Sequence, residues 1–344
     1  METPEFHWPS VLGPLIAGED LSEAAAKAAM DEVMAGRADP AQIAALIALL
    51  RAKGETEEEM TGLVRAMLDA AILVEVGEPV VDTAGTGGDR SGTFNISTTA
   101  ALIAAGAGAK VAKHGNRAAS SKTGSADVLE ALGMNIELDP DAAVRLVREA
   151  GFGFFFAPRY HPAMRHAGPV RAAMGVATVF NYLGPLANPA RARHQAIGVA
   201  DPKMARKMVG VLRNLGSEYA FVYHGRDGLD ELTTTGPSSI LRLKDDEITL
   251  AEFTPEDFGV RRASIEDLLG GGAEENAAIT RAILNGEPGP KRDIALVNAA
   301  PAIVAAGLAD GFAQALPLAR EAVDSGAAGV VLDQAVDLSQ QLAG

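Results

Sequence analysis

The sequence contains no cysteine among its 344 residues. This absence excludes disulfide bonds and thiolate metal sites, and it is typical of a protein from a reducing compartment. No apolar run approaches the roughly 18 residues that a membrane helix needs. The first 20 residues carry Glu2, Glu5, Glu19 and Asp20 and lack the basic and apolar segments of a secretion signal. We therefore expect a cytoplasmic protein.

Positive charge is also scarce in this chain. Thirty Lys and Arg residues against 45 Asp and Glu residues give a net charge of −15. General binding to nucleic acid or to anionic lipid needs a basic surface, so this balance argues against both. Apolar residues are abundant, at 48% of the total, which is enough for a sizeable core. The length suits two lobes, or one large α/β body with a helical addition.

Residues 20–72 have the pattern of three consecutive helices. Capping-box pairs mark their starts, at Asp20 with Glu23, Asp39 with Gln42, and Thr56 with Glu59. Gly36 and Gly54 stand where helices should end. Apolar residues recur along the second and third helices at spacings that give each an apolar face. We interpret these faces as packing surfaces, either within this lobe or against a second subunit.

From residue 79 onward, strand patterns alternate with helical patterns, which predicts a mainly parallel sheet covered by helices on both faces. Strands are expected at 80–83, 110–113, 153–157, 196–199 and 219–224, and helices at 97–105, 125–132, 139–150 and 202–215. Residues 240–253 alternate as a hairpin turning near Asp245 and Asp246, and the remainder to residue 341 is mostly helical. The predicted fold class is α/β: a small, all-helical N-terminal domain plus a larger α/β domain.

A glycine-rich turn, Gly85-Thr86-Gly87-Gly88-Asp89, follows the first expected strand and precedes a helix that begins at Asn95. Glycines let backbone amides approach phosphate oxygens, and a helix start adds unpaired N–H groups and the positive end of the helix dipole. An ordinary loop is the alternative, because a chain with 37 glycines produces short strings of this kind by chance. The order of strand, glycine turn and helix favours a phosphate site.

The segment 110–122 is locally basic within this acidic chain. It contains no acidic residue and carries Lys110, Lys113, His114, Arg117 and Lys122. A solvated basic face is one interpretation. Because the cluster adjoins Gly115 and the small run Ala118-Ala119-Ser120-Ser121, we favour a pocket for a multiply charged anion.

Two adjacent carboxylates, Asp230 and Glu231, follow the strand expected at 219–224. The carboxyl ends of parallel strands are where open α/β sheets bind ligands. Carboxylate oxygens with few other ligands suit Mg²⁺ that is shared with substrate phosphates. Acidic pairs in loops are mostly just solvated, so the magnesium interpretation depends on a phosphate loop elsewhere in the same sheet.

The segment 161–171 contains two histidines and two arginines. Arg165 and His166 are suited to surface ion pairs. Arg171 follows Pro169 near a helix start, where a guanidinium can hold a substrate carboxylate through two parallel hydrogen bonds. Backbone capping is an alternative role for three asparagines that stand among turn formers: Asn95, Asn116 and Asn181.

Together these segments resemble the anthranilate phosphoribosyltransferase family. The similar segments are GTGGD at 85–89, NIST at 95–98, KHGNR at 113–117, GSADVLEALG at 124–133, HPAMRHAGPVR at 161–171, FNYLGPLANP at 180–189 and HGRDGLDE at 224–231. KGETEEEM at 53–60 and RDIALVNAA at 292–300 extend the resemblance over nearly the whole chain. Three positions depart from the family pattern: Met164, Ala177 and Ala187.

The resemblance implies an enzyme of tryptophan biosynthesis. Such an enzyme transfers the phosphoribosyl group of 5-phosphoribosyl 1-pyrophosphate (PRPP) to the amine of anthranilate, with Mg²⁺ as cofactor. It further implies a homodimer formed through a helical domain of residues 1–72 and 163–187. Residues 73–162 and 188–344 would form the α/β domain that binds PRPP and magnesium.

The resemblance also implies roles for single residues. The catalytic set is Lys113, Arg171, Asp230 and Glu231. The PRPP set is Gly85, Gly88, Asp89, Thr93, Asn95, Ile96, Ser97, Thr98, Lys113, His114, Gly115, Asn116, Arg117, Ala118, Ala119, Ser120, Ser121 and Ser125. The anthranilate set is Gly85, His114, Asn116, Pro158, His161 and Arg171. The magnesium set, acting directly or through water, is Ser97, Asp230 and Glu231.

Two other functions stay open at this point. A pyrimidine nucleoside phosphorylase has the same fold, a glycine loop and a lysine-rich phosphate segment, but lacks the spacing from KHGNR to GSADVLEALG. A non-catalytic relative that binds nucleic acid is a further alternative. The net charge and the intact pair of Asp230 and Glu231 argue against it.

Overall fold

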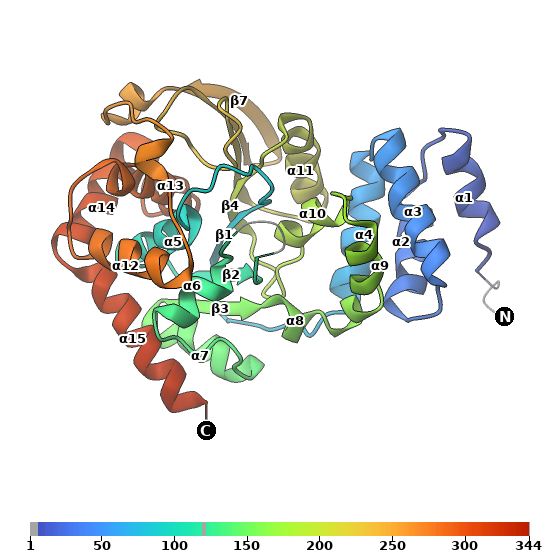
Figure 1. Cartoon of the computed structure of the whole chain (residues 1–344), viewed down its shortest axis with the longest axis horizontal. Helices are drawn as coiled ribbons and strands as arrows, with labels where there is room; N and C mark the ends of the chain where they lie inside the picture. Colours follow the sequence, from blue (N-terminus) through green and yellow to red (C-terminus); the bar gives the residue numbers. More distant parts are fainter. Residues whose placement is uncertain (1–5, 119–121, 344) are drawn as a thin grey trace.

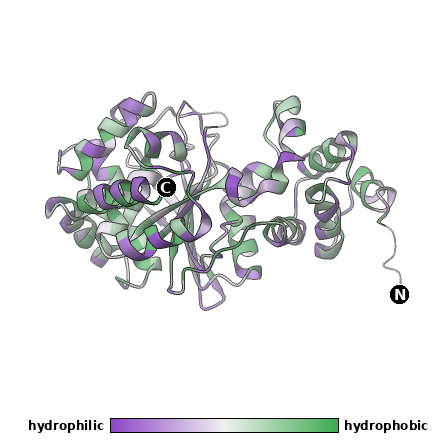
Figure 2. Cartoon of the chain, turned by 90° about the horizontal axis from the view of Figure 1, so that it is seen from below, coloured by the Kyte–Doolittle hydropathy of each residue, from purple (hydrophilic) through white to green (hydrophobic). Residues whose placement is uncertain are grey.

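The computed structural model describes residues 6–118 and 122–343. Figure 1 shows a helical lobe at the N-terminal end and a larger body in which helices surround a sheet. This architecture confirms the predicted fold class. Within the described residues, every helix is too short or too polar to cross a membrane. In Figure 2, hydrophilic and hydrophobic residues alternate along the helices of both parts, as expected where one side of a helix faces a core.

Four helices open the chain: α1 (Pro9–Ile16), α2 (Glu23–Met34), α3 (Pro40–Lys53) and α4 (Glu57–Asp69). The last three confirm the prediction for residues 20–72. At α4 the capping box is complete, with Glu59 N–H donating to Thr56 Oγ1 at 3.1 Å and Thr56 N–H to Glu59 at 2.8 Å. Helix α1 was not predicted, because Pro14 interrupts it and no side chain caps its start.

The cap predicted for α2 is wrong by two residues. Ser22, not Asp20, precedes the helix, and its hydroxyl accepts the Ala25 N–H at 3.2 Å. Asp20 instead accepts a hydrogen bond from Lys53 Nζ at 2.6 Å. A distant lysine therefore competes with the helix start for this carboxylate.

The body contains a seven-stranded sheet in the order β3-β2-β1-β4-β5-β6-β7. Its strands are β1 (Val81–Gly85), β2 (Val111–Gly115), β3 (Phe152–Phe156), β4 (His194–Gly198), β5 (Tyr219–Gly225), β6 (Ser238–Lys244) and β7 (Glu247–Phe253). Strands β1 to β5 pair in parallel, and β6 and β7 add an antiparallel hairpin. The predicted strands and the hairpin that turns at Asp245 and Asp246 are confirmed.

Two apolar cores hold the layers together. The larger joins the sheet to α5 (Ile96–Gly106), α6 (Ser125–Ala131), α7 (Pro140–Ala150), α12 (Ala273–Leu284), α13 (Pro290–Ala305), α14 (Phe312–Asp324) and α15 (Ala327–Leu342). The second joins α1 to α4 with α11 (Pro202–Asn214) and with residues of β4 to β6, such as Ile197, Val222 and Leu241. The helical lobe thus shares its core with part of the sheet.

The chain returns from β3 to the helical lobe before it enters β4. This excursion contains α8 (Ala157–Tyr160), α9 (Gly168–Met174) and α10 (Phe180–Leu183). Helix α9 packs on α3 and α10 packs on α4, beside which Figure 1 shows them. Short 3-10 helices occupy Pro162–Arg165, Gly184–Leu186, Pro255–Phe258 and Glu266–Leu268. Side chains of the segment 161–187 can therefore face the body from the helical lobe.

Candidate active site

The loops that carry the predicted site residues follow the carboxyl ends of β1, β2 and β5. Because these strands are parallel, the three loops meet at one edge of the sheet. The contact between the first and third loops is direct: Gly87 N–H donates to Asp230 Oδ2 at 2.7 Å. The glycine turn and the acidic pair thus form one site, as the sequence predicted.

Two glycines permit this close approach. A Cβ atom at Gly198, the last residue of β4, would lie 1.6 Å from the Asp230 carbonyl oxygen, and one at Gly85 would lie 2.6 Å from Asp230 Oδ2. The turn is tied to β4 as well, since Thr86 N–H donates to the Gly198 carbonyl at 3.0 Å. No side chain fits between the turn, the end of β4 and the acidic pair.

The glycine turn offers free backbone donors. Gly87 and Gly88 have positive φ angles of 65° and 84°, which glycine adopts readily. Within the described residues, the N–H groups of Gly88 and Asp89 donate to no protein acceptor. The Asp89 carboxylate accepts the N–H and the hydroxyl of Ser91, which stabilises the turn from within. Such free amides beside a helix start suit phosphate oxygens.

Asp230 and Glu231 are buried next to each other, which destabilises their charged forms. Burial, reinforced by the Asp89 carboxylate, raises the pKa of Asp230 to about 7. Burial and the neighbouring Asp230 raise the pKa of Glu231 well above its ordinary value, while the Ser97 N–H at the start of α5 hydrogen-bonds its carboxylate. Glu231 Oε2 is buried without a partner in the described part of the chain.

This pair fits a divalent cation. An orphaned buried carboxylate oxygen and two raised pKa values are what a bound cation would relieve. Among the described residues, no group of three or more His, Asp or Glu side chains is arranged to hold a metal ion. Magnesium held here would take its other ligands from water and substrate phosphates, as is usual for this ion.

Lys113 lies in the interior beneath the same edge. Its side chain is 2% exposed, and Nζ donates to the Thr83 carbonyl at 2.5 Å. Burial lowers its pKa, while the charges of Asp82 and Glu231 oppose that shift. The lysine therefore interacts electrostatically with two buried acids.

Asp82 is a member of this network that sequence reasoning missed. Its Oδ1 accepts the His114 N–H at 3.1 Å, and burial raises its pKa to about 6 although Asn188 and Lys113 act against the shift. Asn188 also donates to the Ala112 carbonyl at 2.8 Å. An acidic residue inside the apolar run of β1 was the signal available in the sequence.

His114 and His161 come together from β2 and from the excursion after α8. Their ring centroids are 5.1 Å apart. His161 Nε2 lies 2.9 Å from the carbonyl oxygen of Ala187, one of the three atypical positions. Burial, together with His161, lowers the pKa of His114 to about 3, so its imidazole is neutral at physiological pH. The two histidine rings therefore form an uncharged surface at the site.

Arg171 occupies the middle of α9 and is half-buried. Its Cζ lies 5.0 Å from the centroid of the Phe180 ring, and desolvation lowers its pKa. No carboxylate within the described residues pairs with it. A half-buried guanidinium without an acidic partner can receive a carboxylate from a ligand. Arg165, by contrast, is exposed, and the His166 ring lies against the turn at Gly36.

Two basic residues of the segment 110–118 are bonded to other parts of the described chain. Lys110 Nζ donates to the Arg148 carbonyl at 2.7 Å, and Arg117 pairs with Asp127 at 3.2 Å and with Glu130. Lys110 therefore does not contribute to an anion pocket with the other basic residues, while a role of Arg117 in PRPP binding stays a prediction. Ala119, Ser120 and Ser121, predicted to hold PRPP, lie outside the described residues.

The three asparagines make backbone or side-chain bonds in the protein. Asn116 Oδ1 accepts the Arg117 N–H at 2.7 Å and Asn181 Oδ1 the Thr178 N–H at 3.0 Å, which confirms the turn-stabilising alternative for both. Asn95 Oδ1 instead accepts from Asn276 of α12 at 2.8 Å. A distant helix therefore fixes the start of α5.

The remaining predicted residues surround this edge. Thr93 forms an isolated bridge with Leu269 at the end of the glycine turn. Ile96 and Thr98 lie in the first turn of α5, Ser125 begins α6, and Pro158 lies in α8. Ala118 N–H donates to Asp127 at 3.1 Å, and Gly115 is so close to Ser125 that a Cβ there would lie 2.3 Å from its hydroxyl.

The two parts of the chain match two domains of a known protein family. Residues 77–329 match the α/β domain of a glycosyl transferase family, and residues 9–71 match the helical bundle domain of the same family. The chain therefore belongs to this glycosyl transferase family.

Comparisons with individual relatives show to which members of this family the chain is similar. The chain is 54% identical over 326 residues to an anthranilate phosphoribosyltransferase of Moorella thermoacetica, which covers 94% of this chain and 96% of that protein. The crystal structure of the Thermus thermophilus anthranilate phosphoribosyltransferase is 43% identical, with a TM-score of 0.91 and coverage of 96% and 99%. The Saccharomyces cerevisiae enzyme in complex with PRPP and Mg is 26% identical, with a TM-score of 0.89 and coverage of 97% and 98%. Within the glycosyl transferase family, the chain is a member of the anthranilate phosphoribosyltransferases.

Proposed function

We propose that this protein transfers the phosphoribosyl group of PRPP to the amine of anthranilate in tryptophan biosynthesis. In this reaction the bond between C1 of the ribose and the pyrophosphate oxygen breaks, and a bond from C1 to the anthranilate nitrogen forms. The amine loses one proton. The products are N-(5-phosphoribosyl)anthranilate and pyrophosphate.

One observation carries this proposal: the hydrogen bond between Gly87 N–H and Asp230 Oδ2. It brings a turn with free amides next to a buried acidic pair. A phosphate turn alone suits many ligands, and an acidic pair alone is usually only solvated. Their contact supports a site for a diphosphate that carries a divalent cation.

The chain's own groups would act mainly on the leaving group. The amides of Gly88 and Asp89 would donate to phosphate oxygens, and Lys113 would contribute positive charge from below. Asp230 and Glu231, with Ser97 beside them, are the residues that would hold Mg²⁺. When bound there, magnesium would neutralise charge on the pyrophosphate.

The other half of the site would position the nucleophile. An aromatic amine is unprotonated near neutral pH, so the reaction needs no strong base from the protein. Arg171 would hold the anthranilate carboxylate, and the neutral rings of His114 and His161 would line its path. Good positioning supplies roughly 7–11 kcal/mol of barrier reduction in favourable cases.

The direct test follows the fluorescence of anthranilate. Purified protein with anthranilate, PRPP and MgCl₂ should consume the fluorescent substrate, and omission of PRPP should stop this loss. A correctly folded preparation without turnover would refute the proposal. Phosphate-dependent release of a free base from a pyrimidine nucleoside would point to the nucleoside phosphorylases instead.

We further propose a Mg²⁺-dependent, cytoplasmic homodimer. Helix α1 and the excursion after β3 support dimerisation through the helical domain, because Ile16 and Val176 are 73% and 64% exposed there. Residues 1–72 with 163–187, and 73–162 with 188–344, remain the proposed domain division. The packing of α9 on α3 and of α10 on α4 supports this division.

A further inference from the structure

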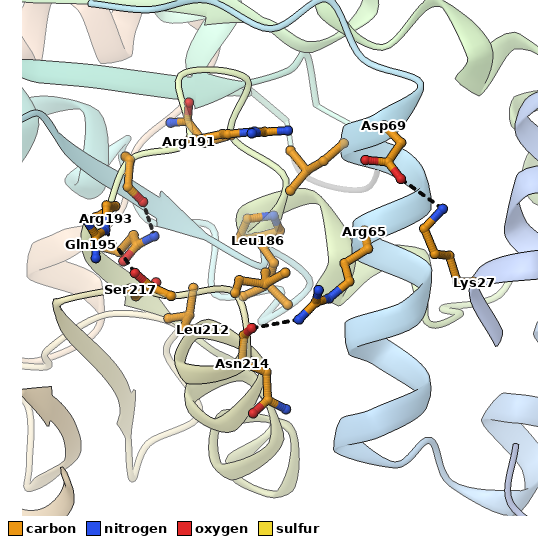
Figure 3. Close-up of a pocket in the computed structure, with 16 residues that line it drawn as sticks. Lys27, Arg65, Asp69, Leu186, Arg191, Arg193, Gln195, Leu212, Asn214 and Ser217 are labelled. Carbon is orange, nitrogen blue, oxygen red and sulfur yellow. Dashed lines mark hydrogen bonds and ion pairs between the residues drawn. The ribbon is translucent and has the colours of Figure 1, made fainter. Parts of the chain in front are cut away.

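Polar side chains join distant parts of the chain at several places outside the glycine turn. One place borders a cavity between α4 and the segment that leads into β4, which Figure 3 shows. There Lys27 pairs with Asp69 at 2.8 Å, and the Arg65 guanidinium donates to the Asn214 carbonyl at 2.9 Å. These bonds stabilise the helical lobe and its contact with α11. Another junction, at Asn298 of α13, lies directly beside the acidic pair.

The backbone after the acidic pair runs outside the sheet. Strand β5 ends at Gly225 and β6 begins at Ser238, so the segment between them has no strand ladder to pair its N–H and C=O groups. Leu232, the residue after Glu231, is 0% exposed. A buried backbone group without a partner is unfavourable. Leu232 therefore needs a donor and an acceptor from elsewhere in the protein.

The side-chain amide of Asn298 supplies both. Its Oδ1 accepts the Leu232 N–H at 2.8 Å, and its Nδ2 donates to the Leu232 carbonyl at 2.9 Å. Nδ2 also donates to the Ile294 carbonyl, one helical turn earlier, at 2.9 Å, which fixes the orientation of the amide. Asn298 is 2% exposed within the apolar interior of α13. A buried polar side chain with low helix propensity is unfavourable there unless such bonds compensate it.

These bonds restrict the position of the acidic pair from one side, and a backbone bond restricts it from the other. The Leu229 carbonyl accepts the Gly225 N–H at 2.9 Å. Asp230 and Glu231 are the only two residues between Leu229 and Leu232, so they cannot shift far without breaking one of these anchors. Helix α13 itself packs on β1, β4 and β5, the strands whose ends form the site. The sheet and the acidic pair are therefore held in register through α13.

We propose that Asn298 is a positioning residue, which holds the Leu232 backbone so that Asp230 and Glu231 can bind the cation of the sugar diphosphate. This inference rests on the proposed function and adds to it a residue that acts through Leu232 rather than by touching a substrate. Asn298 stands in the segment 292–300, to which the proposed function assigns no other residue.

Asn298→Ala removes both bonds to Leu232 and keeps a good helix former in α13. Calorimetric titration of the full-length protein with PRPP and excess MgCl₂, without anthranilate, measures the affinity. The variant should bind PRPP about tenfold more weakly than wild type. With EDTA in place of MgCl₂ the two proteins should bind PRPP equally, because the acidic pair is expected to act on PRPP only through the ion. The KM for anthranilate at saturating PRPP should change less than about twofold.

Ser339→Ala is the matched control for a general loss of stability. Ser339 is also buried, and its hydroxyl accepts the Asn135 N–H at 2.9 Å, so its removal likewise leaves a backbone donor without its partner. This variant should have a lower Tm than wild type and the same affinity for PRPP with MgCl₂. Asn298→Leu is a second test variant. It has the branching of asparagine without polar atoms, and it should show the same magnesium-dependent loss.

Equal PRPP affinity of wild type and both Asn298 variants would overturn the inference. An equal loss with and without MgCl₂ would also overturn it, as would failure of both Asn298 variants to fold, since each would indicate a general structural role. Wild-type protein that binds PRPP with MgCl₂ but does not consume anthranilate would refute the proposed transfer reaction alone, because the binding comparison needs no turnover.

Discussion

At the scale of residues, the site is a set of charges that the protein buries together. Lys113 interacts electrostatically with Asp82 and Glu231, and Asp230 contacts the glycine turn. Arg171 lacks an acidic partner among the described residues. Buried charges that are incompletely compensated are unfavourable for the free protein, and they cluster at functional sites. Substitutions of single residues in this set should therefore change substrate binding and the free energy of unfolding to different extents.

Arg171→Ala should raise the KM for anthranilate by about 10- to 100-fold and change the KM for PRPP far less. The reason is that the substitution removes the proposed charge-assisted partner of the anthranilate carboxylate, and such hydrogen bonds contribute about 1.5–3 kcal/mol. Steady-state kinetics with each substrate varied in turn measures both constants. Arg165→Ala removes an exposed arginine of the same segment and should leave both unchanged.

The opposite pattern is expected for Asp230→Asn combined with Glu231→Gln. This variant should impair the use of PRPP and Mg²⁺, because it removes the carboxylates proposed to hold the ion. Asp245→Asn, in the exposed hairpin turn, is its control. Equal weakening of both substrates by the Arg171 variant and the acidic-pair variant would show that the assigned roles are wrong.

The ionisation of Asp82 should make the free energy of unfolding depend on pH. Its pKa is raised from 3.8 to about 6, so its stabilising contribution is complete below pH 3.8 and is lost as the pH rises through about 6. The difference in unfolding free energy between wild type and Asp82→Asn should thus fall by about 3 kcal/mol from pH 3.5 to pH 7.

Urea unfolding of the two proteins across this pH range measures that difference. His114 acts in the opposite direction, since its lowered pKa makes stability fall as the pH drops from 6.5 toward about 3. Because both proteins contain His114, its effect cancels in the comparison. A difference that is constant with pH would mean that Asp82 is not a buried, titrating acid.

At the scale of elements, the ends of β1, β4 and β5 determine the geometry of the site. The parallel register places Gly85 beside Gly198, and the acidic pair crosses directly over both. The loop that carries the acidic pair can lie this close to the ends of β1 and β4 only if no side chain stands between them. The glycine at the end of β4 is therefore as much a part of the site as the glycines of the turn.

Gly198→Ala should destabilise the protein and disable PRPP use. Its Cβ would meet the Asp230 backbone at 1.6 Å, a contact that only movement of the acidic segment can relieve. Overpacking of this kind costs about 1–3 kcal/mol or more. Thermal unfolding and PRPP kinetics provide the measurement. Gly236→Ala, which has open space around it, should behave like wild type.

Most elements were predictable from the sequence because their signals are local. Capping boxes at Asp39 and Thr56 marked α3 and α4, and apolar runs marked the strands. The cap of α2 was misassigned because Lys53, 33 residues away, binds Asp20. The ion pairs of Arg117 with Asp127 and Glu130 of α6 were likewise not predicted. Contacts between distant residues leave no periodic pattern in a sequence.

At the scale of the whole molecule, the helical lobe is expected to join two copies. Ile16 at the end of α1 is 73% exposed, so its burial against a second copy would remove apolar surface from water. Ile16→Asp should convert a dimer into a monomer, because a charge at a self-complementary interface is present twice.

Light scattering coupled to size-exclusion chromatography measures the mass of the particle. Wild type should have twice the mass of one chain, and Ile16→Asp the mass of one chain. Leu250→Asp on the edge strand β7 is the control, with 55% exposure and no proposed partner, and should remain a dimer. A monomeric wild type would remove the dimer from the proposal and leave the active site unaffected.

The order of the strands predicts that the glycine turn and the acidic pair come together. The sequence predicts the chemical roles of the site residues only in part. Parallel strands place their carboxyl ends together, so the meeting of Asp230 with the glycine turn follows from the order of the elements. Asp82 was missed although it stands as an acid inside the apolar run of β1, because the sequence does not show that it is buried and interacts with Lys113.

The most direct measurement is a crystal structure of the protein with PRPP and MgCl₂. Our account predicts the diphosphate between the Gly88 and Asp89 amides and Lys113, with the ion on Asp230 and Glu231. A diphosphate bound elsewhere, or an ion that contacts neither carboxylate, would contradict it.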